Sequence, residues 1–548
     1  MTAMRWWGWG AAGSSTAELP QPAAKLLRDR LGVDERHTPP VSVDGVRLPE
    51  PALGEDVLAR LRTAVGQEHV RQDPVERISH AAGRSYPDLV RLRSGDGSGA
   101  PDAVVYPGAS DEVAAVLDAC SSGGVAVVPF GGGTSVVGGV EALRDGLAAA
   151  ITLDLSRMDA LVGSDRVSLT ATFQPGITGP RVETLLASRG LTLGHYPQSF
   201  EFATIGGYVA TRSAGQASTG YGRIDELVLG LRCATPAGEI EVKPFPATAA
   251  GPSLLGLLVG SEGVLGVITE ATLGVRPLPE ASRYEGWSFR SFEEGCEAFR
   301  TMEQAEASPD VARLSDEPET ALSMALTSSG SPGERAGRAY LRLRGHDGGC
   351  IALVGFEGEE REIDARRNRT REILRGCDGL SLGERPGRAW LRGRYAGPYL
   401  RDALLDRGVM AETLETATTW SRLDGLYQAV GNALNESLTA RGTPPLVMCH
   451  VSHLYRSGAS LYYTFIAAQE QGAELDQWRA AKSAASDAIV AHGGTITHHH
   501  AVGRDHTPWM RAEVGDLGLE LLRAAKERLD PRGIMNPGKL LPDPGLQS

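Results

Sequence analysis

Three consecutive histidines, His498, His499 and His500, are the densest group of side chains in the sequence that could move protons or bind a metal ion. Two glycines and the apolar Ile496 come just before them, which favours a buried segment over a solvated one. In an extended chain neighbouring side chains point to opposite faces, so we expect only His498 and His500 to share a side. The residues alone leave a metal site, a surface run and a proton-handling cluster open.

Two adjacent tyrosines, Tyr462 and Tyr463, lie in a predicted strand over residues 458–465. Tyrosine is common in strands, where packing in the core is its usual role. Because successive side chains alternate between the two faces of a strand, only one of the two can serve a pocket.

A run of three glycines, Gly131 to Gly133, follows a buried-strand pattern at residues 125–128 and precedes Thr134 and Ser135. Backbone without Cβ atoms can close tightly around a pyrophosphate with its N–H groups pointing inward. The spacing fits neither the dinucleotide fingerprint nor the P-loop, and no lysine follows. On its own, the run would be better explained as a structural turn.

Three further glycine-rich stretches lie at residues 202–211, 214–222 and 260–269. Each of them could be a structural turn. Four such stretches within ~150 residues, about the length of one domain, indicate a long ligand that lies against the backbone. FAD is such a ligand.

The composition limits the partners of this chain. Its net charge of −13 argues against nucleic acid or an anionic membrane as the main partner, because both need a cationic surface. An anionic substrate must then be met by local arginines. Six scattered cysteines are typical of reduced thiols in a cytosolic protein. No apolar run approaches the roughly 20 residues that a membrane span needs.

The pattern along the chain indicates several regions. Residues 1 to about 95 form an arm whose tryptophans we expect to dock on an apolar surface. Short strands and helices alternate from there to residue 275, and an arginine-rich region extends to about residue 480. The predicted elements include strands at residues 149–153, 167–173, 228–235, 264–272, 349–356 and 460–466 and a helix at residues 179–189.

The order strand, helix, strand and glycine loop over residues 101–135 resembles the start of the FAD-binding domain in the vanillyl-alcohol-oxidase superfamily. The motifs PFGGGTS, SFEFATIGGYVATR, YGRIDELV and GSEGVLGVITE are more specifically similar to the alkyldihydroxyacetonephosphate synthase family, the flavoenzymes that make ether lipids. The similarity covers nearly the whole chain. It implies an α+β fold with an N-terminal arm (1–95), a two-subdomain FAD-binding domain (96–275), a cap domain over the flavin (276–480) and a C-terminal segment that returns to the FAD domain (481–548).

The resemblance also implies FAD as the cofactor. We expect it to be bound non-covalently, because the glycine loop offers neither histidine nor cysteine as an attachment point. The residues expected to bind FAD are Pro129, Phe130, Gly131, Gly132, Gly133, Thr134, Ser135, Pro197, Ser199, Thr204, Gly206, Gly207, Ser213, Gly215, Tyr221, Gly222, Glu262, Gly263, Gly266, Val267 and Ile268.

The family match further assigns catalytic positions. Tyr462 and His500 are expected to move protons, His498 and His499 are expected to belong to the same catalytic group, and His195 matches a family active-site histidine. Arg401 and Arg313 match positions that bind or orient a phosphate, for which the planar fork of arginine is suited.

A comparison with the FAD-dependent D-2-hydroxyacid dehydrogenases of the same superfamily bears on the metal. Those enzymes have SGEHGIG where this chain has THHHAVG, so His499 replaces the glutamate that commonly joins a metal site. Four histidines could still hold zinc. We nevertheless expect no metal.

The activity implied by the resemblance is exchange of the acyl group of acyl-dihydroxyacetone phosphate for a long-chain alkyl ether. A flavin oxidase or dehydrogenase of a small 2-hydroxy acid or alcohol is the alternative, and a flavin-binding protein without catalysis is the third interpretation. The substrate would be a small molecule or lipid that carries a phosphate or carboxylate, with no nucleic acid. A cytoplasmic protein is expected, and peripheral membrane contact and a homodimer are left open.

Overall fold

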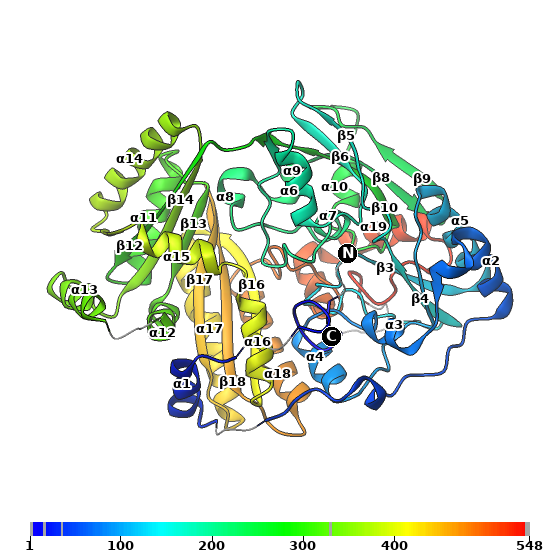
Figure 1. The fold of residues 1–548 in the computed structure, drawn as a ribbon, viewed down its shortest axis with the longest axis horizontal. Coiled ribbons are helices and arrows are strands. Elements are labelled where there is room, and N and C mark those ends of the chain that lie inside the picture. Colours follow the sequence, from blue (N-terminus) through cyan, green and yellow to red (C-terminus); the bar gives the residue numbers. More distant parts are fainter. Residues whose placement is uncertain (1–3, 15–17, 34–36, 328–330, 543–548) are drawn as a thin grey trace.

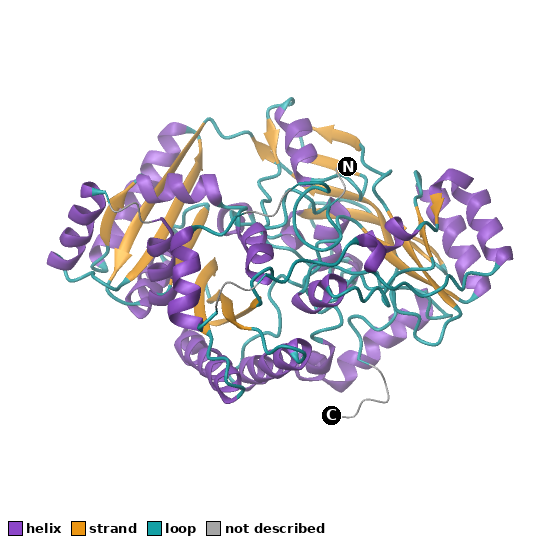
Figure 2. Cartoon of the chain, turned by 60° about the horizontal axis from the view of Figure 1, so that its bottom comes forward, coloured by secondary structure: helices purple, strands orange, loops and turns teal. Residues whose placement is uncertain are grey.

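The computed structural model describes residues 4–14, 18–33, 37–327 and 331–542. Its core is built from a four-stranded, a five-stranded and a seven-stranded sheet, together with one short strand pair. The seven-stranded sheet forms one side of the molecule and the two smaller sheets form the other (Figure 1). Loops and several helices occupy the region between them (Figure 2). The predicted α+β fold is confirmed.

The four-stranded sheet carries the first glycine loop at the end of β3. Its strands are β1 (Val70–Arg71), β2 (Ala103–Val105), β4 (Ala149–Asp154) and β3 (Val125–Phe130), in that order. Strands β2, β4 and β3 run parallel, and α5 (Ser110–Gly123) makes the crossover from β2 to β3. The C-terminal segment joins the free edge of β3, where Val127 donates to the carbonyl of Ile534 at 2.8 Å. Helix α2 (Glu55–Val65) comes before β1 in the chain, and α3 (Pro74–Ser79) and α4 (Tyr86–Arg93) lie between β1 and β2.

The five-stranded sheet is antiparallel and holds the other glycine stretches at its margin. Its order is β5 (Leu161–Asp165), β6 (Thr170–Phe173), β10 (Val267–Gly274), β8 (Val228–Thr235) and β9 (Gly238–Val242). Helix α7 (Ile205–Thr211) packs against β10 and starts at the second glycine stretch. The neighbouring elements are α6 (Gly179–Ala187), β7 (Leu191–Thr192), α8 (Ser218–Tyr221), α9 (Ile224–Leu227), α10 (Leu254–Leu258) and β11 (Arg276–Pro277).

The seven-stranded sheet is also antiparallel. Its order is β15 (Leu380–Gly383), β12 (Ala281–Phe289), β14 (Cys350–Gly358), β13 (Val311–Ser315), β17 (Leu446–Tyr455), β18 (Gly458–Ala468) and β16 (Val409–Thr419). One face is covered by α11 (Phe292–Gln304), α14 (Glu360–Gly376), α17 (Leu423–Ala440) and α18 (Glu474–Ala491), which form the largest apolar core with it. Helix α17 shows why: its buried residues recur every three or four positions, which makes one apolar stripe. The opposite face of the sheet forms one wall of a cavity.

Several shorter helices complete this side of the molecule. Helix α1 (Gln21–Leu31) of the arm packs against α12 (Glu317–Thr327), and α16 (Gly397–Leu405) packs against β16. Helices α13 (Pro332–Leu343) and α15 (Arg385–Gly393) also lie on this side, whereas α19 (Met510–Leu529) packs through Ala525 and Leu529 against the apolar core of the five-stranded sheet (Figure 1). No helix within the described ranges is long and apolar enough to cross a membrane.

The N-terminal tryptophans dock in two different ways. Trp9 is 3% exposed and meets Phe202 edge to face, with ring centroids 5.4 Å apart. The ring of Trp7 instead contacts two guanidinium groups, those of Arg5 at 4.7 Å and Arg93 at 5.6 Å, in a cation–π arrangement. Trp9 therefore packs against an apolar side chain as expected, whereas Trp7 packs against charged ones.

Candidate active site

A cavity of about 540 Å³ lies between the glycine stretches and the free face of the seven-stranded sheet. Three kinds of wall surround it. Glycine-rich backbone forms one side, polar side chains from four strands form the middle, and leucines from α1, α12 and α16 form the far end.

The glycine loop is pressed against the start of α7. A Cβ atom on Gly132 would lie 2.0 Å from the carbonyl oxygen of Phe202, and one on Gly131 would lie 2.3 Å from Oγ1 of Thr204. Gly133, not Gly132, has the positive φ, at +64°. The neighbouring backbone, rather than a left-handed conformation, thus excludes a side chain at Gly132.

The same loop presents unpaired donors. The backbone N–H groups from Gly131 to Val136 donate to no acceptor in the part of the chain that the structure describes. Buried backbone donors are rarely left without a partner, so consecutive ones in a cavity wall indicate a ligand. The residues present therefore fit the pyrophosphate of FAD.

A row of polar side chains crosses the free face of the seven-stranded sheet. Arg313 lies on β13, His450 on β17, Tyr462 on β18 and Glu415 on β16, and the strand register places His450 and Glu415 on either side of Tyr462. The rings of His450 and Tyr462 stack with centroids 4.9 Å apart. Tyr463 points to the opposite face, where its hydroxyl donates to the carbonyl of Tyr427 at 3.2 Å.

The two arginines have different surroundings. Arg313 contacts Oε1 of Glu319 at 2.7 Å and the ring nitrogens of His450 at 3.0 Å. Burial opposes ionisation of Glu319, yet Arg313 and His450 hold its pKa at about 2. Arg401, on α16, donates from Nη1 to the carbonyl of Arg84, and its Nε is buried without a hydrogen-bond partner among the described residues.

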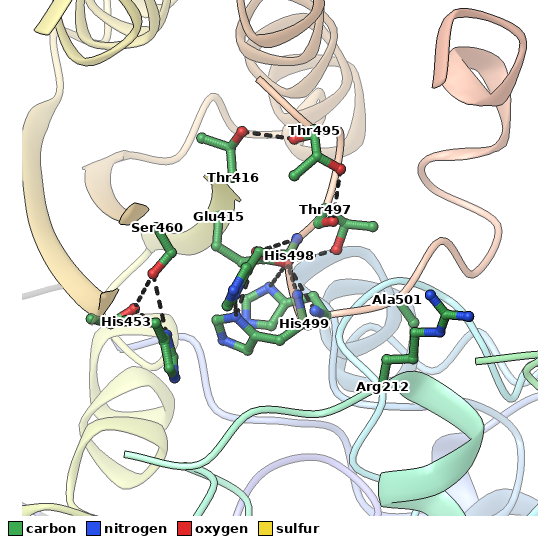
Figure 3. Close-up of polar contacts among 12 residues, drawn as sticks. Arg212, Glu415, Thr416, His453, Ser460, Thr495, Thr497, His498, His499 and Ala501 are labelled. Carbon is green, nitrogen blue, oxygen red and sulfur yellow. Dashed lines mark hydrogen bonds and ion pairs between the residues drawn. The ribbon is translucent and has the colours of Figure 1, made fainter. Parts of the chain in front are cut away.

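The histidine segment corrects the expectation that its side chains alternate. Residues 498–500 form bends rather than a strand, and all three backbone N–H groups donate to the Glu415 carboxylate (Figure 3). The three rings gather beside Tyr462 and Tyr455 as a result. His499 stacks on Tyr462 at 5.9 Å, and His500 meets it edge to face at 5.4 Å.

Burial sets the protonation of this cluster. It lowers the pKa of His499 to about 3 and lowers that of His500 below its usual value, although Glu415 opposes both shifts. Burial raises the pKa of Tyr462 to about 12, against a hydrogen bond from Thr413. Near neutral pH the site therefore holds neutral imidazoles, whose free nitrogens can accept a proton, and a protonated phenol, which can donate one.

His453, His498 and His499 each bring one ligand-type nitrogen within 4.8 Å of the others. The ring nitrogens already have hydrogen-bond partners: Nε2 of His453 contacts the carbonyl of Gly215, and Nε2 of His498 contacts the Tyr455 hydroxyl at 2.5 Å. Nδ1 of His498 and Nδ1 of His499 lie 2.9 Å apart. Because these nitrogens are used in hydrogen bonds, we assign the three histidines to proton sharing and not to a metal site.

Most sequence-predicted residues line the cavity. Five do not, namely His195, His498, Tyr221, Gly222 and Val267. His195 lies behind Ser213 and contacts its hydroxyl at 2.8 Å, and His498 lies behind His499. Tyr221 donates to Glu357 at 2.8 Å, Gly222 caps the C-terminal end of α8 with φ +94°, and Val267 is fully buried in the core.

Sequence reasoning missed Glu415, Glu319 and Trp9. Trp9 lines the cavity, and its backbone N–H donates to Asp402 at 2.6 Å, next to Arg401. A tryptophan expected to dock could have been placed here only with the fold known. Glu415 is one of many acidic residues, and only the pairing of β16 with β18 brings it to Tyr462.

Comparisons with known proteins agree with this geometry. Residues 101–242 match a family model described as "FAD binding domain", and residues 278–540 match "FAD linked oxidases, C-terminal domain". The chain is 34% identical to alkyldihydroxyacetonephosphate synthase of Trypanosoma brucei brucei, over 99% of this chain and 93% of that one. It is 33% identical to the synthase of Dictyostelium discoideum, over 92% and 84%.

A solved structure of alkyldihydroxyacetonephosphate synthase superposes with a TM-score of 0.85 at 29% identity, covering 98% of this chain and 99% of that one. The match thus extends through both sheet layers, the glycine cradle and the histidine segment. FAD is the cofactor that the two family models and these relatives support. The chain belongs to the alkyldihydroxyacetonephosphate synthase family of FAD-dependent enzymes.

Proposed function

We propose that this enzyme exchanges the acyl group of an acyl-dihydroxyacetone phosphate for a long-chain alcohol, giving an alkyl ether and a fatty acid. One observation carries the proposal. The cavity runs from a glycine cradle, past arginine, histidine and tyrosine side chains, to a wall of leucines. Such a cavity matches a flavin, a phosphate-bearing head and an alkyl chain in turn.

The polar middle of the cavity supports binding of a phosphate. The buried Nε of Arg401 has no partner among the described residues and can donate to a phosphate oxygen. Arg313 lies in the same wall, where Glu319 and His450 hold its guanidinium in place. We assign Arg401 to phosphate binding and Arg313 to orienting the bound head group.

The apolar end supports a long chain. Met448 lies in the same row as Thr413 and Thr464, and Ala411 and Ile466 form the next row on the same sheet face. Helices close the space above them. Their contributing side chains are Leu26, Leu27, Leu322, Leu326, Leu400 and Leu404. Burying each CH₂ group of an alkyl chain there would contribute about 0.8 kcal/mol.

The reaction needs proton transfer but no net redox change. The bond between the ester oxygen and the C1 carbon breaks, and the fatty acid leaves with both of its oxygens. The alcohol oxygen bonds to the same carbon and releases its proton. His500 and Tyr462 are placed to take up and pass on that proton, because both line the cavity in mutual contact. Bound FAD would supply a group that can donate and accept an electron pair beside the substrate.

A small hydroxy acid as substrate, the alternative from the sequence, is not favoured. Lactate-sized molecules would leave the leucine wall without an apolar partner, whereas a lipid chain fills it. Absorption spectroscopy under anaerobic conditions distinguishes the two. We expect the flavin band to persist when acyl-dihydroxyacetone phosphate and hexadecanol are added, while ether product accumulates. Bleaching by 2-hydroxy acids without ether formation would contradict the proposal.

Other expectations stay predictions. These are the non-covalent attachment of FAD, the cytoplasmic location, peripheral membrane contact and a homodimer. We also propose domain boundaries near residues 95, 275 and 480.

A further inference from the structure

Two buried carboxyl groups hold the histidine segment from opposite sides of the cavity. Glu415 belongs to β16 of the seven-stranded sheet, and Glu262 precedes β10 of the five-stranded sheet. We propose that Glu415 and Glu262 are positioning residues that fix the backbone of residues 498–503, so that His499 and His500 face Tyr462. The proton-transfer role of those histidines rests on the proposed function.

Glu415 gathers four donors from consecutive residues. Its Oε2 accepts from the N–H of His498 at 2.5 Å, and its Oε1 accepts from the N–H groups of His499 at 3.1 Å and His500 at 2.8 Å. The Thr497 hydroxyl adds a bond of 2.6 Å. Without this carboxylate three backbone donors would be left unpaired inside the protein, at about 1–3 kcal/mol each.

Glu262 holds the other end of the segment. Its two carboxyl oxygens accept from the N–H groups of Val502 at 2.8 Å and Gly503 at 2.7 Å. The backbone carbonyl of Glu262 accepts from Asn536 at 2.7 Å, which ties the same point to the C-terminal segment. The two glutamates therefore join both sheet systems through one short stretch of chain.

The residue between the two anchors supports an imposed conformation. Ala501 has φ +74°, in the region that residues other than glycine rarely adopt. Such a residue persists where its surroundings determine it, and it is often found at functional sites. Hydrogen bonds to Glu415 and Glu262 lie on either side of Ala501 and provide that constraint.

Glu415 also places a negative charge beside the imidazole rings of His499 and His500. Its carboxylate is 2% exposed, and the Nδ1 atoms of His499 and His500 lie 3.5 Å and 3.9 Å from it. Burial works against its ionisation, but the three histidines and Thr497 outweigh burial and keep its pKa well below the usual value. A buried anion beside neutral imidazoles orients their donor nitrogens and favours uptake of a proton.

Glutamine substitution tests the role of each glutamate, because it keeps the volume and removes acceptor capacity. Hydrogen–deuterium exchange on the FAD-loaded enzyme is the first readout. We expect Glu415→Gln to speed exchange at residues 498–500 at least tenfold, and Glu262→Gln to do so at residues 502–503. Glu285→Gln is the matched control: this fully buried glutamate on β12 of the same sheet accepts from Arg371 at 2.9 Å and does not line the cavity.

Steady-state kinetics is the second readout. Glu415→Gln should lower kcat by about 10²-fold, within the range of positioned acid–base groups, with KM changed less than threefold and FAD content unaltered. Unchanged exchange at residues 498–500, wild-type kcat despite faster exchange, or an equal loss in Glu285→Gln would each overturn the proposal. If Glu415→Gln does not fold, Thr497→Val replaces it as the test, and it must give faster exchange at residues 498–500 and a lower kcat, both by smaller factors. If the wild-type enzyme makes no ether, the proposed function fails, but the exchange data still decide the positioning role.

Discussion

Tyr462 and Tyr463 are neighbours with opposite surroundings. Tyr462 faces the cavity between His450 and the histidine segment, whereas Tyr463 is fully buried against α17. Removing only the hydroxyl of each tests the proton role. Tyr462→Phe should lower kcat by about 10²–10⁴-fold with FAD content and Tm near wild type. Tyr463→Phe should leave turnover nearly intact and affect stability alone. Equal kinetic losses in both variants would return Tyr462 to a packing role.

The sequence predicted which residues belong to the site better than it predicted where their side chains point. The alternation of Tyr462 and Tyr463 followed from strand periodicity, and the structure agrees. The same rule was wrong for His498 to His500, because the Glu415 carboxylate draws three successive N–H groups to one point and bends the chain. Glu415 is distant in sequence, so local pattern could not reveal this bend.

The glycine loop and the start of α7 act together as one element of the site. A side chain on Gly132 would collide with the carbonyl of Phe202, 2.0 Å from its Cβ position, and would separate the two stretches. Gly132→Ala should therefore abolish FAD retention through gel filtration. Gly163→Ala is the control, because a Cβ there meets nothing within 4 Å. Normal FAD content in Gly132→Ala would contradict the assignment of the glycine loop to FAD binding.

At the element scale, strands with strong apolar patterns were predicted closely. The strand predicted at residues 228–235 is β8 (Val228–Thr235), and the helix predicted at residues 179–189 is α6 (Gly179–Ala187). The strand predicted at residues 167–173 starts later, as β6 (Thr170–Phe173), because residues 166–169 form the turn of the hairpin with β5. Which strands pair could not be predicted, since pairing joins segments far apart in sequence.

At the scale of the whole molecule, the cavity needs the entire chain. Trp9 and α1 come from the arm, the cradle from residues 129–139, the polar row from four strands of the seven-stranded sheet, and His499 from the C-terminal part. The sequence indicated two parts of this arrangement, the glycine cradle and the histidines. It could not indicate the leucine wall, because α1 and α12 approach each other only in the folded chain.

The most direct test of the proposed exchange follows the alcohol oxygen. The FAD-loaded enzyme is incubated with acyl-dihydroxyacetone phosphate and hexadecanol labelled with ¹⁸O in its hydroxyl group, and the products are analysed by mass spectrometry. The proposal predicts that the ether product carries the label and that the released fatty acid carries none. Label in a hexadecyl ester of the fatty acid, with no labelled ether, would show acyl transfer instead and contradict the account.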